Sequence, residues 1–176
     1  MDVAELVRRQ NQGEHLEFVF FWGHETPGPG FLSQWCPSPF TVDGVTYATA
    51  EHYMMAEKAR LFGDDQRAAA ILTSPDPRRA KDLGRRVRNF DERTWKEHRV
   101  AIVTRGNEAK FAQHPDMRDY LLSTHPRVLV EASPRDRIWG IGLRADDPRA
   151  KTPDSWQGEN LLGFALMTTR DALAAA

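Results

Sequence analysis

The order of apolar, polar and chain-breaking residues predicts short strands before a mainly helical part. Leu16–Trp22 is rich in aromatic and β-branched residues and predicts a buried strand. Proline and glycine recur over residues 24–30, which indicates a loop. Asp43-Gly44 then stands between Thr41-Val42 and Val45–Tyr47, and this pattern is typical of a tight hairpin.

Capping residues and apolar spacing predict helices from residue 49 onward. Thr49 is a suitable N-cap for a helix over residues 50–62, and Gly63 is well placed to end it. Four more helices are predicted: over 64–73, from Pro77 toward Val87 with Asp76 as cap, from the cap Asp91 to about Gln113, and a short one after Pro115. A buried strand over Val128–Glu131, an exposed loop over 144–158 and a last helix that begins at Asn160 complete the chain.

Length and composition predict one domain over residues 1–176, with its core over about 16–176. The chain has 176 residues, 40% of them hydrophobic, which is enough for one sizeable core. Its 24 basic and 25 acidic residues leave a net charge of -1, so there is no overall positive field to attract a phosphate backbone. A role on nucleic acid would therefore have to rest on a local basic patch.

The cysteine content and the terminal sequence predict a reduced, cytoplasmic protein. Cys36 is the single cysteine, and charges are scattered over residues 1–12 where a secretion signal needs an apolar core. No apolar run approaches the roughly 20 residues of a membrane-spanning helix. The six histidines lack the close spacing of a zinc site, which favours chemistry without a metal.

The predicted helix over 50–62 carries the strongest candidate for chemistry. Glu51, Met55, Lys58 and Phe62 follow helical spacing, so a carboxylate and an amine share a face with apolar residues. Glu51 and Lys58 are about 10 Å apart along the axis, a separation suited to bracketing a ligand. The alternative is that Lys58 extends to water and Glu51 only complements the helix dipole.

A second candidate is the segment Ser133–Leu143, which directly follows the predicted strand over Val128–Glu131. Loops at strand ends are common positions for reactive groups, and Asp136 lies in this one. Gly140 beside Trp139 permits close approach of the backbone to a flat ligand, on which the indole can stack. The alternative is that Trp139 is an ordinary core residue.

Three further groups are candidates for substrate binding. Ser33, Gln34 and Trp35 combine a hydroxyl, an amide and an indole, which can read a base edge or a ribose hydroxyl or can cap a turn. Arg85 and Arg88 are candidates for a phosphate clamp, with a solvated helix face as the alternative. Asn160 is also a candidate, although an asparagine at a helix start is usually a cap. No glycine-rich phosphate loop and no serine nucleophile elbow occur in the sequence.

The order of these segments resembles the NADAR or YbiA-like family over nearly the whole chain, from Phe18 to Arg170. The matching strings are Phe31–Trp35, Val42-Asp43-Gly44, Thr49–Tyr53 with Ala56-Glu57-Lys58, Gly84-Arg85, Ala109–His114, Leu129-Val130-Glu131, Asp136–Gly140, Asn160–Gly163 and Leu166-Met167.

This resemblance implies a mostly helical α+β domain with a small antiparallel sheet. It implies a hydrolase, an N-glycosidase that cleaves bonds between ribosyl groups and nitrogen without a metal or redox cofactor. Two substrate classes are associated with such proteins: phosphoribosylamino-pyrimidine intermediates of riboflavin synthesis, and ADP-ribose attached to guanine in DNA. By motif position, Glu51 and Lys58 belong to the active site, joined by Asp136 and Trp139. Ile141 stands where family members often have Asp, which makes Asp136 the candidate carboxylate of its loop.

The residue types fit the chemistry of such a reaction. Breaking the bond from an anomeric carbon to nitrogen builds positive charge on the sugar, which Glu51 or Asp136 can stabilise, or either can activate water. Lys58 can protonate the leaving nitrogen, or as a neutral amine can form a Schiff base with the ring-opened sugar. Trp139 or Trp35 is expected to stack on the base.

Two other functions fit the same residues. One is a non-catalytic sensor that binds NAD or ADP-ribose. The other is a repair hydrolase that reverses the action of a DNA ADP-ribosyltransferase toxin, and this predicts a basic rim around the pocket.

Overall fold

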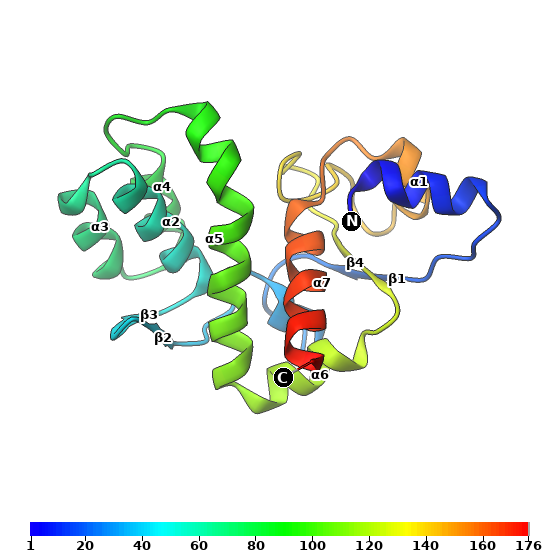
Figure 1. Cartoon of the computed structure of the whole chain (residues 1–176), viewed down its shortest axis with the longest axis horizontal. Coiled ribbons are helices and arrows are strands. Elements are labelled where there is room, and N and C mark those ends of the chain that lie inside the picture. Colours follow the sequence, from blue (N-terminus) through cyan, green and yellow to red (C-terminus); the bar gives the residue numbers. More distant parts are fainter. Residues whose placement is uncertain (176) are drawn as a thin grey trace. The chain divides into compact units, whose positions relative to one another are not determined.

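Seven α-helices and two two-stranded sheets make up residues 1–175, the part that the computed structural model describes (Figure 1). The mostly helical content and the small antiparallel sheet confirm the predicted α+β class. The chain groups into two compact units, Gln34–Pro115 and the pair of segments Met1–Ser33 and Asp116–Ala176. A single domain over the whole chain stays a prediction.

The helix α2 (Ala50–Leu61) is the centre of the unit Gln34–Pro115. It packs against three other helices, and Figure 1 shows it among them: α3 (Asp65–Leu72), α4 (Pro77–Gly84) and α5 (Glu92–Gln113). Burial therefore extends around most of α2 and includes Glu51 and His52 as well as its apolar residues. The predicted helix boundaries are correct to within one to three residues at each end.

The predicted N-caps of three of these helices are confirmed, since each side chain accepts a hydrogen bond from the first turn. Thr49 Oγ1 accepts from the His52 N–H at 3.3 Å. Asp76 and Asp91 accept from backbone N–H groups three residues later, each at 2.8 Å. These bonds satisfy donors that have no partner within the helix, which is why the boundaries can be read from the sequence.

Two glycines allow the neighbouring helices to approach α2 closely. A Cβ at Gly84 of α4 would lie 2.0 Å from the sulfur of Met55, and one at Gly106 of α5 would lie 2.4 Å from the ring of Tyr53. Either contact is far below van der Waals separation. The missing side chains therefore set the distances of α4 and α5 from α2.

The hairpin of the same unit forms as predicted. β2 (Phe40–Val42) pairs with β3 (Val45–Tyr47) in antiparallel register, Phe40 opposite Tyr47. Asp43 and Gly44 both have positive φ, 50° and 78°, which a two-residue hairpin turn of this type requires.

The other unit contains the parallel pair β1 (Phe18–Phe21) and β4 (Val128–Glu131), with Phe18 opposite Val128. The two strands were predicted, but their pairing was not. Around them lie α1 (Val3–Asn11), α6 (Pro115–Ser123) and α7 (Leu161–Ala174), and α7 packs on β4.

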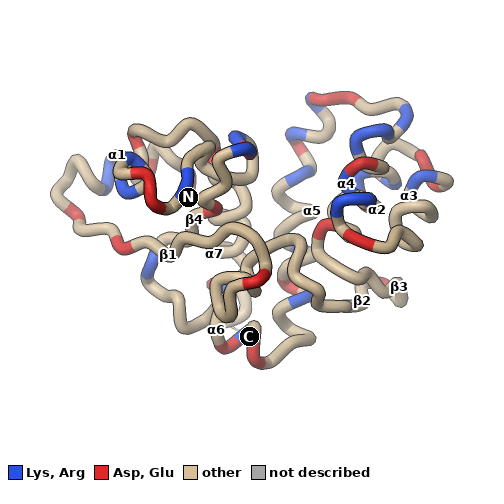
Figure 2. The backbone as a smooth tube through the Cα atoms, turned by 180° about the vertical axis from the view of Figure 1, so that it is seen from behind, with Lys and Arg blue, Asp and Glu red and all other residues tan. Residues whose placement is uncertain are grey.

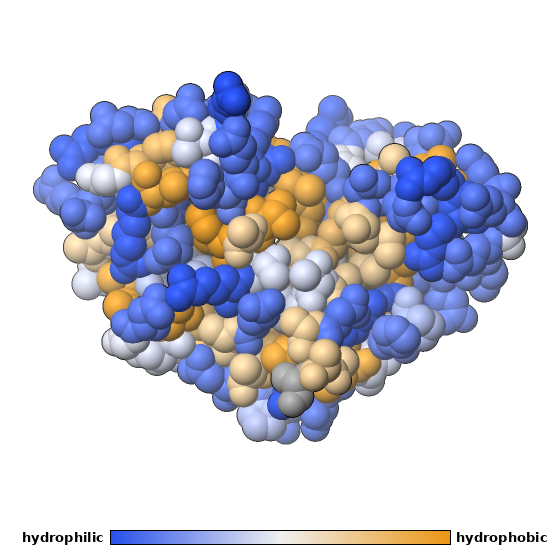
Figure 3. Space-filling view, in the orientation of Figure 1, coloured by the Kyte–Doolittle hydropathy of each residue, from blue (hydrophilic) through white to orange (hydrophobic). Residues whose placement is uncertain are grey.

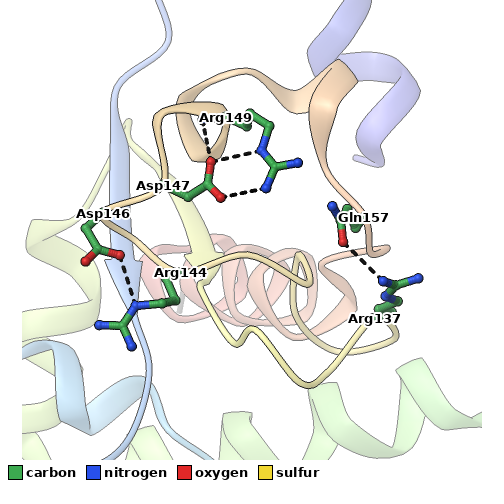
Figure 4. A network of polar contacts seen from close by, with 6 residues as sticks. All are labelled: Arg137, Arg144, Asp146, Asp147, Arg149 and Gln157. Atoms are coloured by element: carbon green, nitrogen blue, oxygen red, sulfur yellow. Dashed lines mark hydrogen bonds and ion pairs between the residues drawn. The ribbon is translucent and has the colours of Figure 1, made fainter.

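The segment 144–158, predicted as an exposed loop, contains two short 3₁₀ helices, Pro148–Lys151 and Pro153–Ser155. Ion pairs join Arg144 to Asp146 and Arg149 to Asp147, while Arg137 donates to Gln157 (Figure 4). Ala150 and Pro153, one in each 3₁₀ helix, are buried, so the segment is anchored to its unit.

None of the helices within residues 1–175 combines the length and apolar character needed to cross a membrane.

Candidate functional site

The amine of Lys58 lies over two aromatic rings. Its Nζ is 4.3 Å from the centroid of Phe90 and 5.4 Å from that of Trp95. Phe90 immediately precedes the cap of α5, and its ring packs edge-on against Phe62 at 5.3 Å between centroids. The quadrupole of an aromatic face attracts a cation, so these rings hold the ammonium in place.

The environment of Lys58 lowers the pKa of its amine from the ordinary value. Burial is the largest cause, because it disfavours the charged form, and the nearby Arg85 guanidinium acts in the same direction. Glu51 raises the pKa and partly opposes both. An amine with a lowered pKa gives up its proton more readily and is more often present as a nucleophile, and both properties suit catalysis.

Glu51 lies in the first turn of α2 and is only 2% exposed. Its backbone N–H donates to the carbonyl oxygen of Gln34 at 2.9 Å. The positive end of the helix dipole favours a carboxylate at this position. Two helical turns separate it from Lys58, as the sequence predicts.

Gln34 connects the start of α2 to α5. Its side-chain oxygen accepts a hydrogen bond from Asn107 Nδ2 at 3.0 Å, and the same amide nitrogen donates to the carbonyl of Val103 at 2.9 Å. Gln34 is 8% exposed and Asn107 is fully buried. Gln34 thus fixes the backbone next to Glu51, while Trp35, its neighbour, is half-buried.

The two predicted phosphate-binding arginines differ in their contacts. Arg88 donates to the buried carboxylate of Asp64 through its backbone N–H, Nε and Nη2, the last at 2.9 Å. This pairing lowers the pKa of Asp64 to about 2. Arg85 is exposed and has only a 3.4 Å contact with Asp82. The geometry therefore favours Arg85 for contact with a phosphate and gives Arg88 a structural part.

In the other unit, Asp136 organises the loop that follows β4. One of its carboxylate oxygens accepts from the backbone N–H groups of Ile138, at 2.9 Å, and Trp139, at 2.8 Å. A Cβ at Gly140 would lie 2.8 Å from the carbonyl oxygen of Glu131, so only glycine fits there. Trp139 lies between Asp136 and Gly140 in the sequence and is half-buried.

Asn160 and Ser33 are also buried in this unit. Asn160 precedes α7, but its side chain does not cap that helix. Instead it accepts from the Glu131 N–H at 3.0 Å and donates to the Leu129 carbonyl at 2.9 Å, which ties α7 to β4. Ile141 is fully buried, so this position of the loop serves the core.

The predicted residues therefore form two groups. Gln34, Trp35, Glu51, Lys58, Arg85 and Arg88 belong to the unit around α2, and Ser33, Asp136, Trp139, Gly140 and Asn160 belong to the unit around β4. The catalytic and binding parts assigned to them stay predictions. Among residues 1–175, no group of three or more His, Cys, Asp or Glu side chains is arranged to hold a metal ion.

Sequence reasoning missed two sets of aromatic residues. Phe90 and Trp95 contact the Lys58 amine. Phe90 directly precedes the predicted cap Asp91 and Trp95 follows it by four residues, and this is the one local signal that could have marked them. Trp22 follows β1 and is 53% exposed. Since β1 and β4 are parallel, Trp22 and the loop after Glu131 leave from the same end of the pair.

Comparison with known proteins identifies relatives over most of the chain. The model of the NADAR domain matches residues 20–174. An N-glycosidase of Acanthamoeba polyphaga mimivirus is 44% identical over 162 residues, covering 88% of this chain and 95% of that protein. The N-glycosidase YbiA of Escherichia coli is 32% identical over 145 residues, which is 82% of each chain.

A solved structure and a longer relative complete the comparison. The NMR structure of Escherichia coli YbiA has a TM-score of 0.74 with 29% identity, and the match covers 92% of this chain and 88% of that one. A riboflavin biosynthesis protein of Vibrio vulnificus is 30% identical over 82% of this chain, which corresponds to 35% of its own length.

Proposed function

The chain belongs to the NADAR domain family, and we propose that it is an N-glycosidase that hydrolyses the bond between a ribosyl group and a nitrogen of a nucleobase or aminopyrimidine. Relatives that match over most of their length are named N-glycosidases, which supports this class of activity.

The observation that carries the proposal is the placement of the Lys58 amine. It is half-buried against Phe90 and Trp95, and its pKa is lowered. Burial and the nearby Arg85 guanidinium make this amine a better proton donor, and more often a free nucleophile, than a lysine in water. We infer that Lys58 takes part in the proton transfer or bond formation of the reaction.

The reaction needs a proton donor and a group that stabilises positive charge. Hydrolysis breaks the bond from the anomeric carbon to nitrogen, leaves a proton on that nitrogen and adds water oxygen to the sugar carbon. Lys58 in its ammonium form supplies the proton, and the carboxylate of Glu51 stabilises the oxocarbenium-like sugar or takes a proton from the attacking water. As a free amine, Lys58 would instead attack the anomeric carbon and displace the base, which leaves with a proton. The ring-opened imine formed on Lys58 is then hydrolysed by water, which releases the sugar and restores the amine.

The resemblance to the family implies two substrate classes for this chemistry. The first is a phosphoribosylamino-pyrimidine of the riboflavin pathway, and the Vibrio relative named a riboflavin biosynthesis protein supports it. The second is ADP-ribose on guanine of DNA, which would pair this protein with a DNA ADP-ribosyltransferase. Arg85 is the group that would contact a phosphate of either substrate.

Release of the free base or aminopyrimidine from both substrates tests the proposal. Lys58→Met keeps the apolar stem and removes the amine, so turnover should fall by about 10²–10⁴-fold with the fold intact. Lys96→Met is the matched control, because Lys96 is exposed on α5 and pairs with Glu92. A folded Lys58→Met variant with wild-type turnover would refute the assignment.

Borohydride added during turnover distinguishes the two possible roles of Lys58, acid catalysis and imine formation. A ribosyl adduct trapped on Lys58 supports the imine, and unmodified protein during active turnover supports acid catalysis. Binding of ADP-ribose without release of base from any substrate would instead indicate the non-catalytic sensor.

A further inference from the structure

In the described part of the chain, the strand β1 pairs with β4 along one edge and leaves its other edge open. The Ala132 N–H, just after β4, donates to the Phe21 carbonyl at 2.9 Å. Alternate residues bond to the partner in a parallel ladder, so the backbone groups of Val19 and Phe21 face β4. Those of Phe18 and Phe20 point the other way, where they form no hydrogen bond within residues 1–175. We call this side of the strand the β1 edge.

The outer edge of β4 is closed, in contrast, by the chain itself. The Asn160 side chain accepts from the Glu131 N–H and donates to the Leu129 carbonyl, and both of these groups point away from β1. The 3₁₀ helix over Pro29–Leu32 comes near β1, but among the described residues it does not bond to the outward groups of the strand. The β1 edge therefore keeps its donors and acceptors available.

The sequence of β1 lacks the features that protect a free edge from pairing. Natural edges carry lysine, proline or a bulge, whereas β1 reads Phe-Val-Phe-Phe and pairs with β4 in regular register throughout. Figure 2 shows no charged position along β1, although the segment that joins α1 to it has acidic ones. Trp22 directly follows the strand and is 53% exposed. An open edge of this composition is a template for another strand.

A cleft of about 480 Å³ adjoins β1 and is lined by the side chains of Phe18 and Phe20, together with residues of the same unit. The two rings stack with 5.8 Å between their centroids, and both are half-buried. The end of α1 also lines the cleft, and on the face drawn in Figure 3 the surface over α1 is mostly hydrophilic. Apolar contact area within a polar rim is typical of a surface that binds a protein segment.

The charges of this cleft favour an acidic partner. Within residues 1–175 the guanidinium of Arg127 donates to backbone carbonyl groups, and Lys151 has no carboxylate partner. Glu14 is already paired with Arg9, which leaves Glu17 as the one unpaired carboxylate of the lining. Two cations thus stand against one carboxylate. Arg127 directly precedes β4, so its charge lies near the start of the strand pair.

We propose that the β1 edge binds an extended, acidic peptide segment of another protein, which adds a third strand to the β1–β4 pair. Hydrogen bonds to the backbone of Phe18 and Phe20 set the register of the segment, and alternate side chains pack on the two rings. Its acidic residues lie at Arg127 and Lys151. A second copy of this chain fits less well, because its own β1 edge lies beside the same cleft and the end of α1.

The test is an NMR titration of isotope-labelled protein with a capped peptide of alternating threonine and valine that ends in two aspartates. Threonine and valine favour strands, and the aspartates supply the charge. We expect the amide signals of Phe18 and Phe20 to shift and their hydrogen exchange to slow by about ten-fold or more. The amides of Val19 and Phe21 should change less, because they already bond to β4. The same peptide ending in two lysines should bind about five-fold more weakly.

A pair of variants isolates the backbone bond. Phe20→Pro removes the N–H that points to the β1 edge and leaves the bonds to β4 in place. Phe20→Val is the matched control, because it loses the same ring but keeps the N–H. We expect Phe20→Pro to bind about ten-fold more weakly than Phe20→Val, the effect of one hydrogen bond. If urea denaturation shows that Phe20→Pro is not folded, the same comparison is made at Phe18, the first residue of the strand, where proline is tolerated.

A second pair of variants tests the charge. Lys151→Gln should weaken binding of the aspartate peptide about three-fold at low salt, and the difference should vanish as salt is added. Lys96→Gln on α5 is the control and should bind as the wild type does.

The inference is overturned if the Phe18 and Phe20 amides do not shift at about 1 mM peptide, or if Phe20→Pro and Phe20→Val bind equally well. Tighter binding of the lysine peptide than of the aspartate peptide would also overturn it. Sedimentation of the wild type as a dimer that Phe20→Pro, but not Phe20→Val, converts to a monomer would assign the β1 edge to a second copy of the chain instead.

Discussion

The ammonium group of Lys58 lies 4.3 Å from the ring centroid of Phe90, a residue 32 positions away in the sequence. The contact favours the charged form of the amine, while burial and Arg85 disfavour it and produce a net lowering of the pKa. Phe90 is 45% exposed, so this contact lies at the protein surface. Substitution of Phe90 therefore changes the electrostatic environment of the Lys58 amine while every residue of α2 is kept.

Phe90→Leu should therefore lower the pKa of Lys58 further. A cation–π contact at an exposed site contributes about 0.5–1 kcal/mol, equivalent to about half a pKa unit. If Lys58 acts as an acid, the alkaline limb of the pH profile of kcat moves to lower pH by that amount. If it reacts as a free amine, the acidic limb moves to lower pH instead.

Phe62→Leu is the control, because Phe62 contacts Phe90 and belongs to the same aromatic group. Its pH profile should move less than that of Phe90→Leu. Equal profiles for wild type and Phe90→Leu would show that the ring does not act on the titrating group.

The helices of the unit around α2 could be predicted because their signals are local. Thr49, Asp76 and Asp91 bond within the next three residues, and Asp43-Gly44 dictates its own turn. Such contacts depend on sequence neighbours alone, so spacing is sufficient to find them.

The rest depended on contacts between distant residues. β1 and β4 pair in parallel although they are more than a hundred residues apart in the sequence. No local pattern specifies such a distant partner. Arg88 could be recognised as a cation, but its pairing with Asp64 could not be read from the sequence. Its part in binding phosphate stays a prediction. Glu51 and Lys58 share one helix, so helical spacing predicts their separation. Phe90 was missed because it reaches Lys58 through a contact between distant parts of the sequence.

Glu51→Gln should reduce kcat by about 10²–10⁴-fold with a smaller change in KM. Glutamine retains the shape of the side chain but has no negative charge to stabilise an oxocarbenium-like sugar or to accept a proton. Steady-state kinetics of base release measures the effect. Glu57→Gln is the control, since Glu57 lies on the same helix and pairs with Arg60. Unchanged kcat in a folded Glu51→Gln protein would remove Glu51 from the mechanism.

Arg88→Gln should lower stability in a way that depends on pH. Arg88 holds the pKa of Asp64 at about 2, below its ordinary value of 3.8. A lowered folded-state pKa stabilises the fold above pH 4 and loses that effect as the pH falls toward 2. The urea midpoints of wild type and Arg88→Gln should thus differ at pH 6 and converge between about pH 4 and 2.

The same variant separates the two arginines in substrate binding. Arg88→Gln should leave KM for a phosphorylated substrate nearly unchanged, while Arg85→Gln should raise it about ten-fold, the effect of losing one charged hydrogen bond. A larger rise in KM for Arg88→Gln than for Arg85→Gln would restore Arg88 as the phosphate contact.

Asn160→Ala tests whether this buried amide serves the fold or the substrate. The change removes the hydrogen bonds to the Glu131 N–H and the Leu129 carbonyl. Loss of each is expected to cost about 1–3 kcal/mol of the free energy of unfolding, because the backbone groups are left buried. Asn160 also has a φ of 53°, and alanine there adds about 1 kcal/mol of strain.

Asn89→Ala isolates the strain, since Asn89 has a φ of 55° and its side chain is exposed. Urea denaturation should show that the free energy of unfolding falls by about 1 kcal/mol for Asn89→Ala and by about 3–7 kcal/mol for Asn160→Ala. Glycine tolerates the positive φ. The free energy of unfolding of Asn160→Gly should therefore be about 1 kcal/mol higher than that of Asn160→Ala. If Asn160→Ala instead matches Asn89→Ala in stability while KM rises, the amide contacts the substrate, and the bonds to β4 contribute little to holding α7.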